Sequence, residues 1–326
     1  MINKIHMWKI VLSVLLALSP LYAAAQSQSS LTLTLTPPLF QLTIGPGESW
    51  ASSLKVVNSN PYDITLYASV MDFAAGGERG QGKLTPIVRR EGGEASNTLA
   101  EWIEVSQEPF VVPKGTSREV AFAVHIPANA SPGGHYAAIL VGTQSLGGVQ
   151  DGPSISVSSL ISSLFFVRIK GEVVEKGDIN SLRSDHWAYF NQSPEVKLAL
   201  QFENRGNVHL QPKGEIVITT MWGNEVGKIP INENTNFGNV LPGSTRTYDF
   251  VWQGDGSMFD FGLYRAVATV TFGEDGHQNT DATASFWIIP IKPLLYSLGG
   301  LLALVLIVAF LIRGYIRRSL AAHTRH

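Results

Sequence analysis

Apolar side chains recur at every second position over much of this chain, and this two-residue period restricts the fold more than any other feature. Residues 31–36 read Leu-Thr-Leu-Thr-Leu-Thr, and similar patterns occur at residues 53–58, 64–70, 119–126 and 136–141. Successive side chains of a β-strand point to opposite faces, so alternation predicts strands with one buried face. Before Pro293 no segment keeps a helical apolar stripe over three turns. The pattern therefore predicts an all-β fold.

Short groups of glycine, proline and asparagine separate these segments. They occur at residues 45–47, 58–61, 113–115 and 131–134. These residue types supply the backbone geometry that tight turns require. Short strands at regular spacing with such breaks predict β-sandwiches of the immunoglobulin-like type.

A weak internal repeat indicates two sandwiches rather than one. The turn that begins at Pro113 leads into an alternating strand and then into a Gly-x-Tyr strand that contains Tyr136. The same order recurs at Pro242 and Tyr264, with offsets of 242 − 113 = 129 and 264 − 136 = 128 residues. A shared order of strands and turns is typical of a duplicated structural unit.

Each unit also has an asparagine at the end of an earlier strand, Asn58 in the first and Asn204 in the second. We expect the boundary between the units near residues 170–177. The predicted organisation is one immunoglobulin-like domain over residues 26–172 and another over residues 173–290. Cysteine is absent from the chain, so each sandwich must be stabilised by its apolar inner faces.

The N-terminus has the three parts of a secretory signal peptide. Lys4 and Lys9 precede an apolar run over residues 10–21, and three alanines follow at residues 23–25. The run is too short to span a bilayer, and the small residues fit a cleavage site. We expect residues 1–25 to be a signal peptide.

The C-terminus has the pattern of a membrane anchor. Residues 293–312 contain no charged side chain, and twenty residues at about 1.5 Å each cover the roughly 30 Å of hydrocarbon in a bilayer. Four arginines follow, and no acidic residue occurs after Asp281. By the positive-inside rule, a basic tail stays in the cytoplasm. The sequence predicts a transmembrane helix over residues 291–312, a cytoplasmic tail over residues 313–326, and a single-pass type I topology in the cell membrane.

The formal net charge of −2 conceals an acidic exported region. Seven of the 24 basic residues flank the two apolar end segments, which leaves 24 − 7 = 17 bases against all 26 acids, or a net charge of −9. A region of this sign does not bind nucleic acid through bulk charge. We therefore expect no nucleic-acid partner.

No catalytic or metal-binding motif is apparent. The absence of cysteine excludes thiolate metal sites and a cysteine nucleophile. The eight histidines form no HExxH motif and no pair at metal spacing, and no Gly-x-Ser-x-Gly motif occurs. We expect a protein that is not an enzyme and has no cofactor and no metal. A hydrolase with a site assembled from distant loops is the weakest alternative.

Strand-and-turn motifs lie at residues 40–48, 55–58, 64, 72–73, 111–115, 124–127 and 132–138. These motifs resemble those of a known family of bacterial surface proteins, the WxL-interacting proteins. That family has a signal peptide, two immunoglobulin-like domains, a membrane helix and a basic tail. The resemblance implies that the first domain binds peptidoglycan and that the second contacts other proteins. The first domain also looks similar to pilus-chaperone-like sandwiches.

Two groups of residues are candidates for binding. His135 and Tyr136 could line a groove for sugar, since tyrosine offers an apolar face and a polar tip. The alternative for Tyr136 is a core position, because Tyr264 matches it in the second unit.

The second group lies in the connection over residues 184–191. It contains Trp187, Tyr189 and Phe190 among polar residues, and exposed aromatic side chains suit the binding of a partner. The alternative is that these rings cover the edge of the second sandwich.

Two hypotheses of function follow. In the first, the chain is a membrane-anchored surface protein that binds peptidoglycan and surface or secreted proteins. In the alternative, it is a chaperone-like assembly subunit that pairs a strand edge with other surface proteins.

Overall fold

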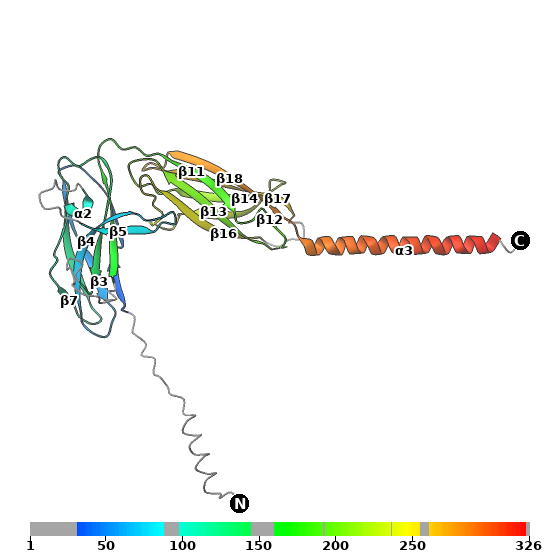
Figure 1. Cartoon of the computed structure of the whole chain (residues 1–326), viewed down its shortest axis with the longest axis horizontal. Helices are drawn as coiled ribbons and strands as arrows, with labels where there is room; N and C mark the ends of the chain where they lie inside the picture. The colour runs from blue at the N-terminus through cyan, green and yellow to red at the C-terminus, as the bar shows by residue number, and fades with distance from the viewer. Residues whose placement is uncertain are drawn as a thin grey trace, which may run out of the picture. The chain divides into compact units, whose positions relative to one another are not determined.

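The computed structural model describes residues 31–87, 98–144, 160–191, 193–235, 237–254 and 261–323. The chain divides into two units, Met1–Thr32 and Leu33–His326, and all that follows concerns the second unit. The expected signal peptide lies outside the described residues. The described part is built of β-strands and ends in one long helix, so the predicted fold class is confirmed (Figure 1).

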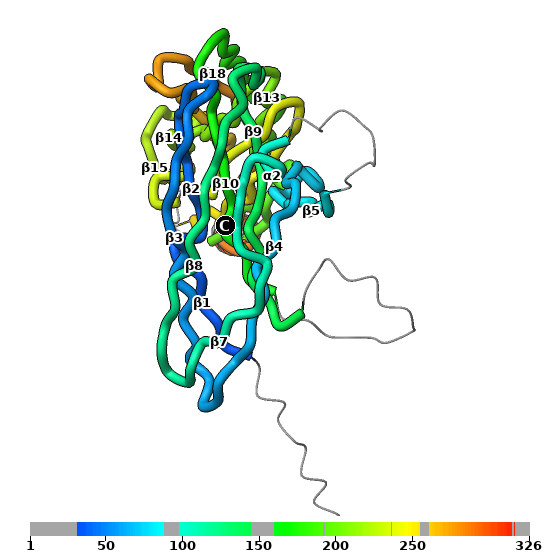
Figure 2. Tube along the Cα trace, turned by 90° about the vertical axis from the view of Figure 1, so that its left-hand side faces the viewer, coloured from blue at the N-terminus to red at the C-terminus, as the bar shows by residue number. Residues whose placement is uncertain are grey.

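Two sheets form the first sandwich. One has the strand order β1-β3-β8-β6, and the other has the order β2-β10-β9-β4-β5 with β7 also paired to β4. In Figure 2, β3 and β8 run together on one side of this sandwich, and β9 and β4 run on the other. The elements are β1 (Leu33–Thr36), β2 (Leu39–Ile44), β3 (Ser49–Asn58), β4 (Ile64–Ala75), β5 (Gly82–Pro86), α2 (Leu99–Trp102), β6 (Ile103–Val105), β7 (Phe110–Val112), β8 (Ser117–His125), β9 (Gly133–Gly142) and β10 (Leu160–Ile169).

Two more sheets form the second sandwich, with the strand orders β11-β13-β16 and β12-β18-β17-β14-β15. A helix follows the last strand. The elements are β11 (Gly177–Ser184), β12 (Ala188–Tyr189), β13 (Glu195–Asn204), β14 (Lys213–Thr220), β15 (Glu225–Ile231), β16 (Thr245–Gln253), β17 (Gly262–Phe272), β18 (Gln278–Ile288) and α3 (Ile291–His323).

The two-residue period of the sequence is reproduced in burial. Along β13 every second side chain is buried, from Val196 to Phe202, and the residues between them face outward or lie half-buried. These side chains meet those of the opposite sheet, where Tyr264 and Phe286 stack with ring centroids 5.8 Å apart. Burial of such apolar faces stabilises a sandwich by about 25 cal/mol per Å².

The first two strands of the chain, β1 and β2, belong to different sheets of the first sandwich. β1 pairs antiparallel with β3, and β2 pairs parallel with β10. The peptide bond between Thr36 and Pro37, which separates β1 from β2, is cis. Because the chain changes sheets here, the edge of β10 that faces β2 is paired only from the residue where β2 begins.

A buried asparagine ties three segments together in each sandwich. In the first, the Asn58 side-chain nitrogen donates to the carbonyls of Tyr62 and Val112 at 2.9 and 3.0 Å, and its oxygen accepts from the Asn60 amide at 2.9 Å. The backbone amide of Asn58 donates to the Thr116 carbonyl at 2.9 Å. One side chain thus joins the end of β3, the turn that follows, and the end of β7.

The same contacts recur in the second sandwich around Asn204. Its nitrogen donates to the carbonyls of Val208 and Val240 at 2.7 and 2.8 Å, and its oxygen accepts from the Gly206 amide at 2.9 Å. Its backbone amide donates to the Ser244 carbonyl at 3.0 Å. Both asparagines are fully buried, so no water replaces these bonds when the side chain is lost.

Replacing either asparagine is predicted to destabilise its sandwich. Asn58→Ala or Asn204→Ala removes at least three side-chain hydrogen bonds from a fully buried position, which should lower the free energy of unfolding by about 3 kcal/mol. Urea unfolding of the detergent-solubilised chain measures the effect. Asn279→Ala, at an exposed position of β18, is the control and should change stability by less than about 0.5 kcal/mol. Equal effects at Asn204 and Asn279 would contradict this account.

Helix α3 is the described element that fits a membrane. Its segment Ile291–Gly314 has 24 residues with a mean hydropathy of 2.6, and none of it is buried against the rest of the chain. The helix is long and apolar enough to span a bilayer.

Candidate functional site

Strand β10 has one edge that is only partly paired. On one side it pairs with β9 along its whole length, from Leu160↔Gly142 to Ile169↔Gly133. On the other side β2 pairs with it only from Leu164 onward. Within the described parts of the chain, no strand pairs with this second side over residues 160–163.

The hydrogen bond of the next residue along β10, Leu164, shows which way the backbone groups on this edge point. The Leu164 amide donates to the Pro38 carbonyl at 3.0 Å, so the backbone of Leu164 faces the β2 side. Backbone groups alternate in direction along a strand. The amide and carbonyl groups of Leu160 and Ser162 therefore face the same open side.

The residues around these groups leave the edge accessible. Leu160 is 41% exposed, and Ser162 is also exposed, whereas Ser163 is buried. The Ser163 hydroxyl donates to the Pro37 carbonyl at 2.8 Å, which holds the chain at the point where it leaves for the other sheet. The open edge therefore ends at Ser163.

The other end of β10 takes part in an ion-pair network. Arg168 contacts Glu175 at 2.6 Å and Glu274 at 3.2 Å, and the Glu274 amide donates to the Glu175 carboxylate at 3.0 Å. Arg168 and Glu175 are largely buried, with 17% of each side chain exposed. This network links the end of β10 to the segment that precedes β11 and to the turn between β17 and β18.

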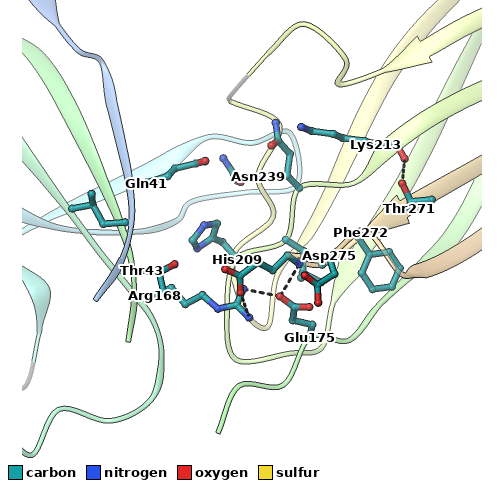
Figure 3. Close-up of a pocket in the computed structure, with 16 residues that line it drawn as sticks. Gln41, Thr43, Arg168, Glu175, His209, Lys213, Asn239, Thr271, Phe272 and Asp275 are labelled. Atoms are coloured by element: carbon teal, nitrogen blue, oxygen red, sulfur yellow. Dashed lines mark hydrogen bonds and ion pairs between the residues drawn. The ribbon is translucent and has the colours of Figure 1, made fainter. Parts of the chain in front are cut away.

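A polar pocket of ≈ 520 Å³ lies beside this network (Figure 3). Gln41 and Thr43 of β2 line one wall, and Lys213 and Asn239 lie across from them. Because two carboxylates already pair with Arg168, the guanidinium is not free to hold an anionic ligand there. Besides the ion-pair network, the pocket lining thus offers neutral polar groups, the Lys213 ammonium and the Asp275 carboxylate.

His209 lines the pocket and packs against aromatic rings of the first sandwich. Its ring centroid lies 5.7 Å from that of Tyr136 and 5.3 Å from that of Phe166, and the Tyr136 hydroxyl lies 3.5 Å from its Nδ1. Burial, with a smaller contribution from the positive charge of Arg168, lowers the pKa of His209 to about 4. The imidazole is therefore neutral near pH 7.

The turn between β4 and β5 contacts strand β16 of the second sandwich. The carbonyl of Glu78 accepts a hydrogen bond from the Thr247 amide at 2.5 Å, and Arg79 lies 3.9 Å from Asp249. Because β16 pairs with β13 on one side, the Thr247 amide must face the opposite, outer side of β16.

The candidate residues of the first sandwich lie on opposite faces of β9. His135 packs against Trp102 at 4.7 Å, and its Nε2 lies 2.9 Å from the Ser131 carbonyl. Tyr136 points the other way, toward Phe166 and His209. The two side chains do not line one groove, and Tyr136 is half-buried.

The candidate residues of the second sandwich divide between surface and core. Trp187 and Phe190 are exposed. Tyr189 is buried, where its hydroxyl donates to the Asp185 carboxylate and its ring contacts Phe286 at 5.6 Å. Only the first two are therefore available to a partner.

Sequence reasoning did not identify Leu160, Ser162, Arg168 or His209. Leu160 and Ser162 contribute backbone amide and carbonyl groups, and the type of a residue does not indicate whether its backbone groups are paired. Arg168 and His209 meet their partners only through the tertiary fold. Within the described residues, no group of three or more His, Asp or Glu side chains is placed to hold a metal ion.

Lowering the pH should weaken the contact around His209. The unfolded imidazole, with an ordinary pKa near 6.5, binds a proton that the folded one does not take up until about pH 4. The contribution of this group to the free energy of unfolding is therefore complete above pH 6.5. It is lost as the pH falls toward 4, which lowers the free energy of unfolding by about 3 kcal/mol. Urea unfolding followed by tryptophan fluorescence at several pH values measures this loss.

The matched variant is His209→Gln, which does not titrate in this range. It should remove the part of the pH dependence that lies between pH 6.5 and 4. An unchanged pH profile in the variant would contradict the assignment to His209.

Comparisons with known proteins show distant similarity to solved structures only. No family profile and no curated protein matches the sequence. The class 5 fimbriae chaperone CfaA has 10% identity over 79% of this chain and 100% of its own, with a TM-score of 0.38.

Two further chaperone structures resemble the chain to a similar degree. The Escherichia coli chaperone DraB has 14% identity over 79% of this chain and 97% of its own, with a TM-score of 0.32. The CsuC–CsuE chaperone–tip adhesion subunit complex of Acinetobacter baumannii has 13% identity over 78% and 98%, with a TM-score of 0.34. At such scores the likeness carries no inference about function.

Proposed function

We propose that the chain is a membrane-anchored protein that binds other extracytoplasmic proteins by accepting a β-strand on the open edge of β10. The observation that carries the proposal is a pair of backbone positions, Leu160 and Ser162, that no described strand pairs on the side where β2 begins. Main-chain hydrogen bonds to an added strand supply affinity in this mode of binding, and side-chain pockets supply specificity.

The edge lacks the features that usually prevent strand pairing. Natural sheets protect their edges with lysine, proline, bulges or inward-pointing charges. Residues 160–163 read Leu-Ile-Ser-Ser, with no charge and no proline. The pairing of β10 with β9 also continues here without a register shift. An edge of this kind favours the addition of a strand.

The burial pattern also defines the chemistry of the added strand. Leu160 and Ser162 direct their side chains outward, while Ile161 is half-buried and Ser163 is buried. Side chains of adjacent strands share faces, so every second residue of the partner would lie beside Ile161, toward the core. The partner segment should be extended, with apolar and polar residues in alternation.

Helix α3 would tether the chain that carries this edge to the membrane. The arginines at residue 313, in the last turn of the span, and at residues 317 and 318 beyond it favour a cytoplasmic C-terminus, which leaves both sandwiches outside. Anchoring raises the effective concentration of the edge relative to other proteins of the envelope, so a short strand pairing is sufficient for useful binding.

The chaperone-like alternative uses the same edge but differs in the lifetime of the complex. A surface receptor keeps its partner, whereas an assembly chaperone passes its client on. Pulse–chase labelling separates the two. Persistent crosslinks to one protein favour the receptor, and crosslinks that fade while the client appears elsewhere in the envelope favour the chaperone.

Peptidoglycan binding, which the family resemblance implies, is a separate proposal. It is tested by incubating the detergent-solubilised chain with isolated sacculi. Sedimentation with the sacculi across a range of salt and pH supports it, and failure under all these conditions rejects it. Either result leaves the strand-pairing proposal untouched.

A proline at Ser162 should block strand pairing without unfolding the sandwich. Proline removes an amide that faces the open side, and edge positions tolerate it. With a photo-crosslinking residue in place of Leu160, the full chain in its native membrane should form crosslinks to envelope proteins. Ser162→Pro should reduce their yield at least tenfold.

The control is Val251→Pro on β16. Val251 is exposed and, by alternation from Thr247, its amide faces the outer side of the strand. This variant should keep the crosslinks and the unfolding midpoint. Equal yields from Ser162→Pro and the unsubstituted chain, both folded by circular dichroism, would reject the proposed edge.

A further inference from the structure

The exposed tryptophans of the described chain belong to the second sandwich. Trp187, Trp222 and Trp287 are 72%, 69% and 43% exposed, whereas Trp102 and Trp252 are buried. Tryptophan is highly buried on average, so a group of exposed indoles needs a partner.

Strand register places the backbones of Trp187 and Trp287 side by side. Ala188 of β12 pairs with Trp287 of β18, and the Trp287 amide donates to the Trp187 carbonyl at 2.9 Å. Trp287 is the second-last residue of β18. Trp187 and Trp287 therefore lie at the end of the sandwich from which the chain enters α3.

The third tryptophan lies at the same end. Trp222 follows β14, whose last residue, Thr220, pairs with Tyr264 near the start of β17. The first residue of β17, Gly262, pairs with Ile288. The β14–β15 turn is therefore close to the last residues of β18.

Other large apolar side chains complete this surface, which we call the aromatic end. Met221 contacts the start of β17, since a Cβ on Gly262 would lie 2.5 Å from its sulfur. By contrast, the exposed large apolar residues at the opposite end of this sandwich, within the described residues, are Val174 and Phe237. The aromatic end consists of Trp187, Phe190, Met221, Trp222, Phe261 and Trp287.

The connection to α3 keeps this surface near the candidate membrane span. β18 ends at Ile288 and the span begins at Ile291. At 3.3–3.6 Å per residue, so short a connection reaches about 10 Å at most. If α3 crosses a bilayer, the aromatic end cannot lie far from its surface.

We propose that the aromatic end is seated in the headgroup region of the bilayer that α3 enters. This inference rests on the proposed membrane anchoring. Tryptophan prefers that region because its ring is apolar and its N–H is polar. Lys292 and Tyr296, both exposed near the start of α3, are residue types that suit the same depth.

The consequence is a second attachment of the chain to the membrane. With α3 alone, the second sandwich would be attached to the bilayer at one point. Insertion of the aromatic end gives the second sandwich a defined orientation to the bilayer.

Site-directed spin labelling of the full chain tests the proposal. Because the chain has no cysteine, each introduced cysteine is a unique label site. The labels are placed at Asn224 and His186, which are exposed beside Trp222 and Trp187, at Phe237 on the opposite end, and at Leu302 within the span. Each labelled chain is reconstituted in vesicles of phosphatidylcholine and phosphatidylglycerol, and the accessibility of the label to oxygen and to a water-soluble nickel complex is measured.

The expected result is a several-fold higher ratio of oxygen to nickel accessibility at Asn224 and His186 than at Phe237. The value at Leu302 should be the highest of all. Water-like values at Asn224 and His186 with a buried label at Leu302 would overturn the proposal and leave the anchor intact. A water-like value at Leu302 would reject the anchor itself.

Paired substitutions give a second measurement. Trp187→Ser with Trp222→Ser should shift the label at Asn224 to water-like values and leave the label at Leu302 unchanged. The matched pair, Val174→Ser with Phe237→Ser, should shift neither label. If labels at Asn224 on different chains instead broaden one another, and dilution with unlabelled chain removes both this broadening and the protection from nickel, a second copy covers the aromatic end and the proposal is wrong.

Discussion

Both sandwiches depend on one buried side chain that makes the same bonds in each. Asn58 and Asn204 each tie the end of a long strand to its own turn and to the end of a second segment. With no disulfide to hold the sheets, the apolar faces alone do not fix the position of these ends. Hydrogen bonds are directional, so the asparagines set the geometry that apolar burial leaves open.

Among the described strands of the first sandwich, one edge stays unpaired because of the way the sheets are divided. The chain leaves one sheet after β1 and joins the other at β2, which covers β10 only from Leu164 onward. The Ser163 hydroxyl and the Pro37 carbonyl fix the point of crossing. The uncovered edge is thus a product of topology, and the ion pairs of Arg168 and the packing of His209 hold the far end of the same strand.

The sequence was sufficient to predict the all-β class, because alternation along strands such as β13 is a direct consequence of one-sided burial. It also located both asparagines and the apolar C-terminal segment. Among the candidate residues, it could not tell that Tyr189 turns inward to Asp185 while Trp187 stays exposed, since both lie in one short connection. The edge at Leu160 and Ser162 could not be predicted from the sequence, because whether its backbone groups are paired depends on where the distant strand β2 begins. The ion pair of Arg168 with Glu274 could not be predicted either, because the two residues are far apart in the chain.

The central claim, that β10 accepts a strand, is tested most directly by amide hydrogen exchange resolved to single residues. In the isolated chain the amides of Leu160 and Ser162 should exchange rapidly, while those of Ile161 and Ser163, which face β9, should be protected. In the complex with a crosslinked partner, all four should be protected. Protection of Leu160 and Ser162 in the isolated chain, or rapid exchange that persists in the complex, would contradict the claim.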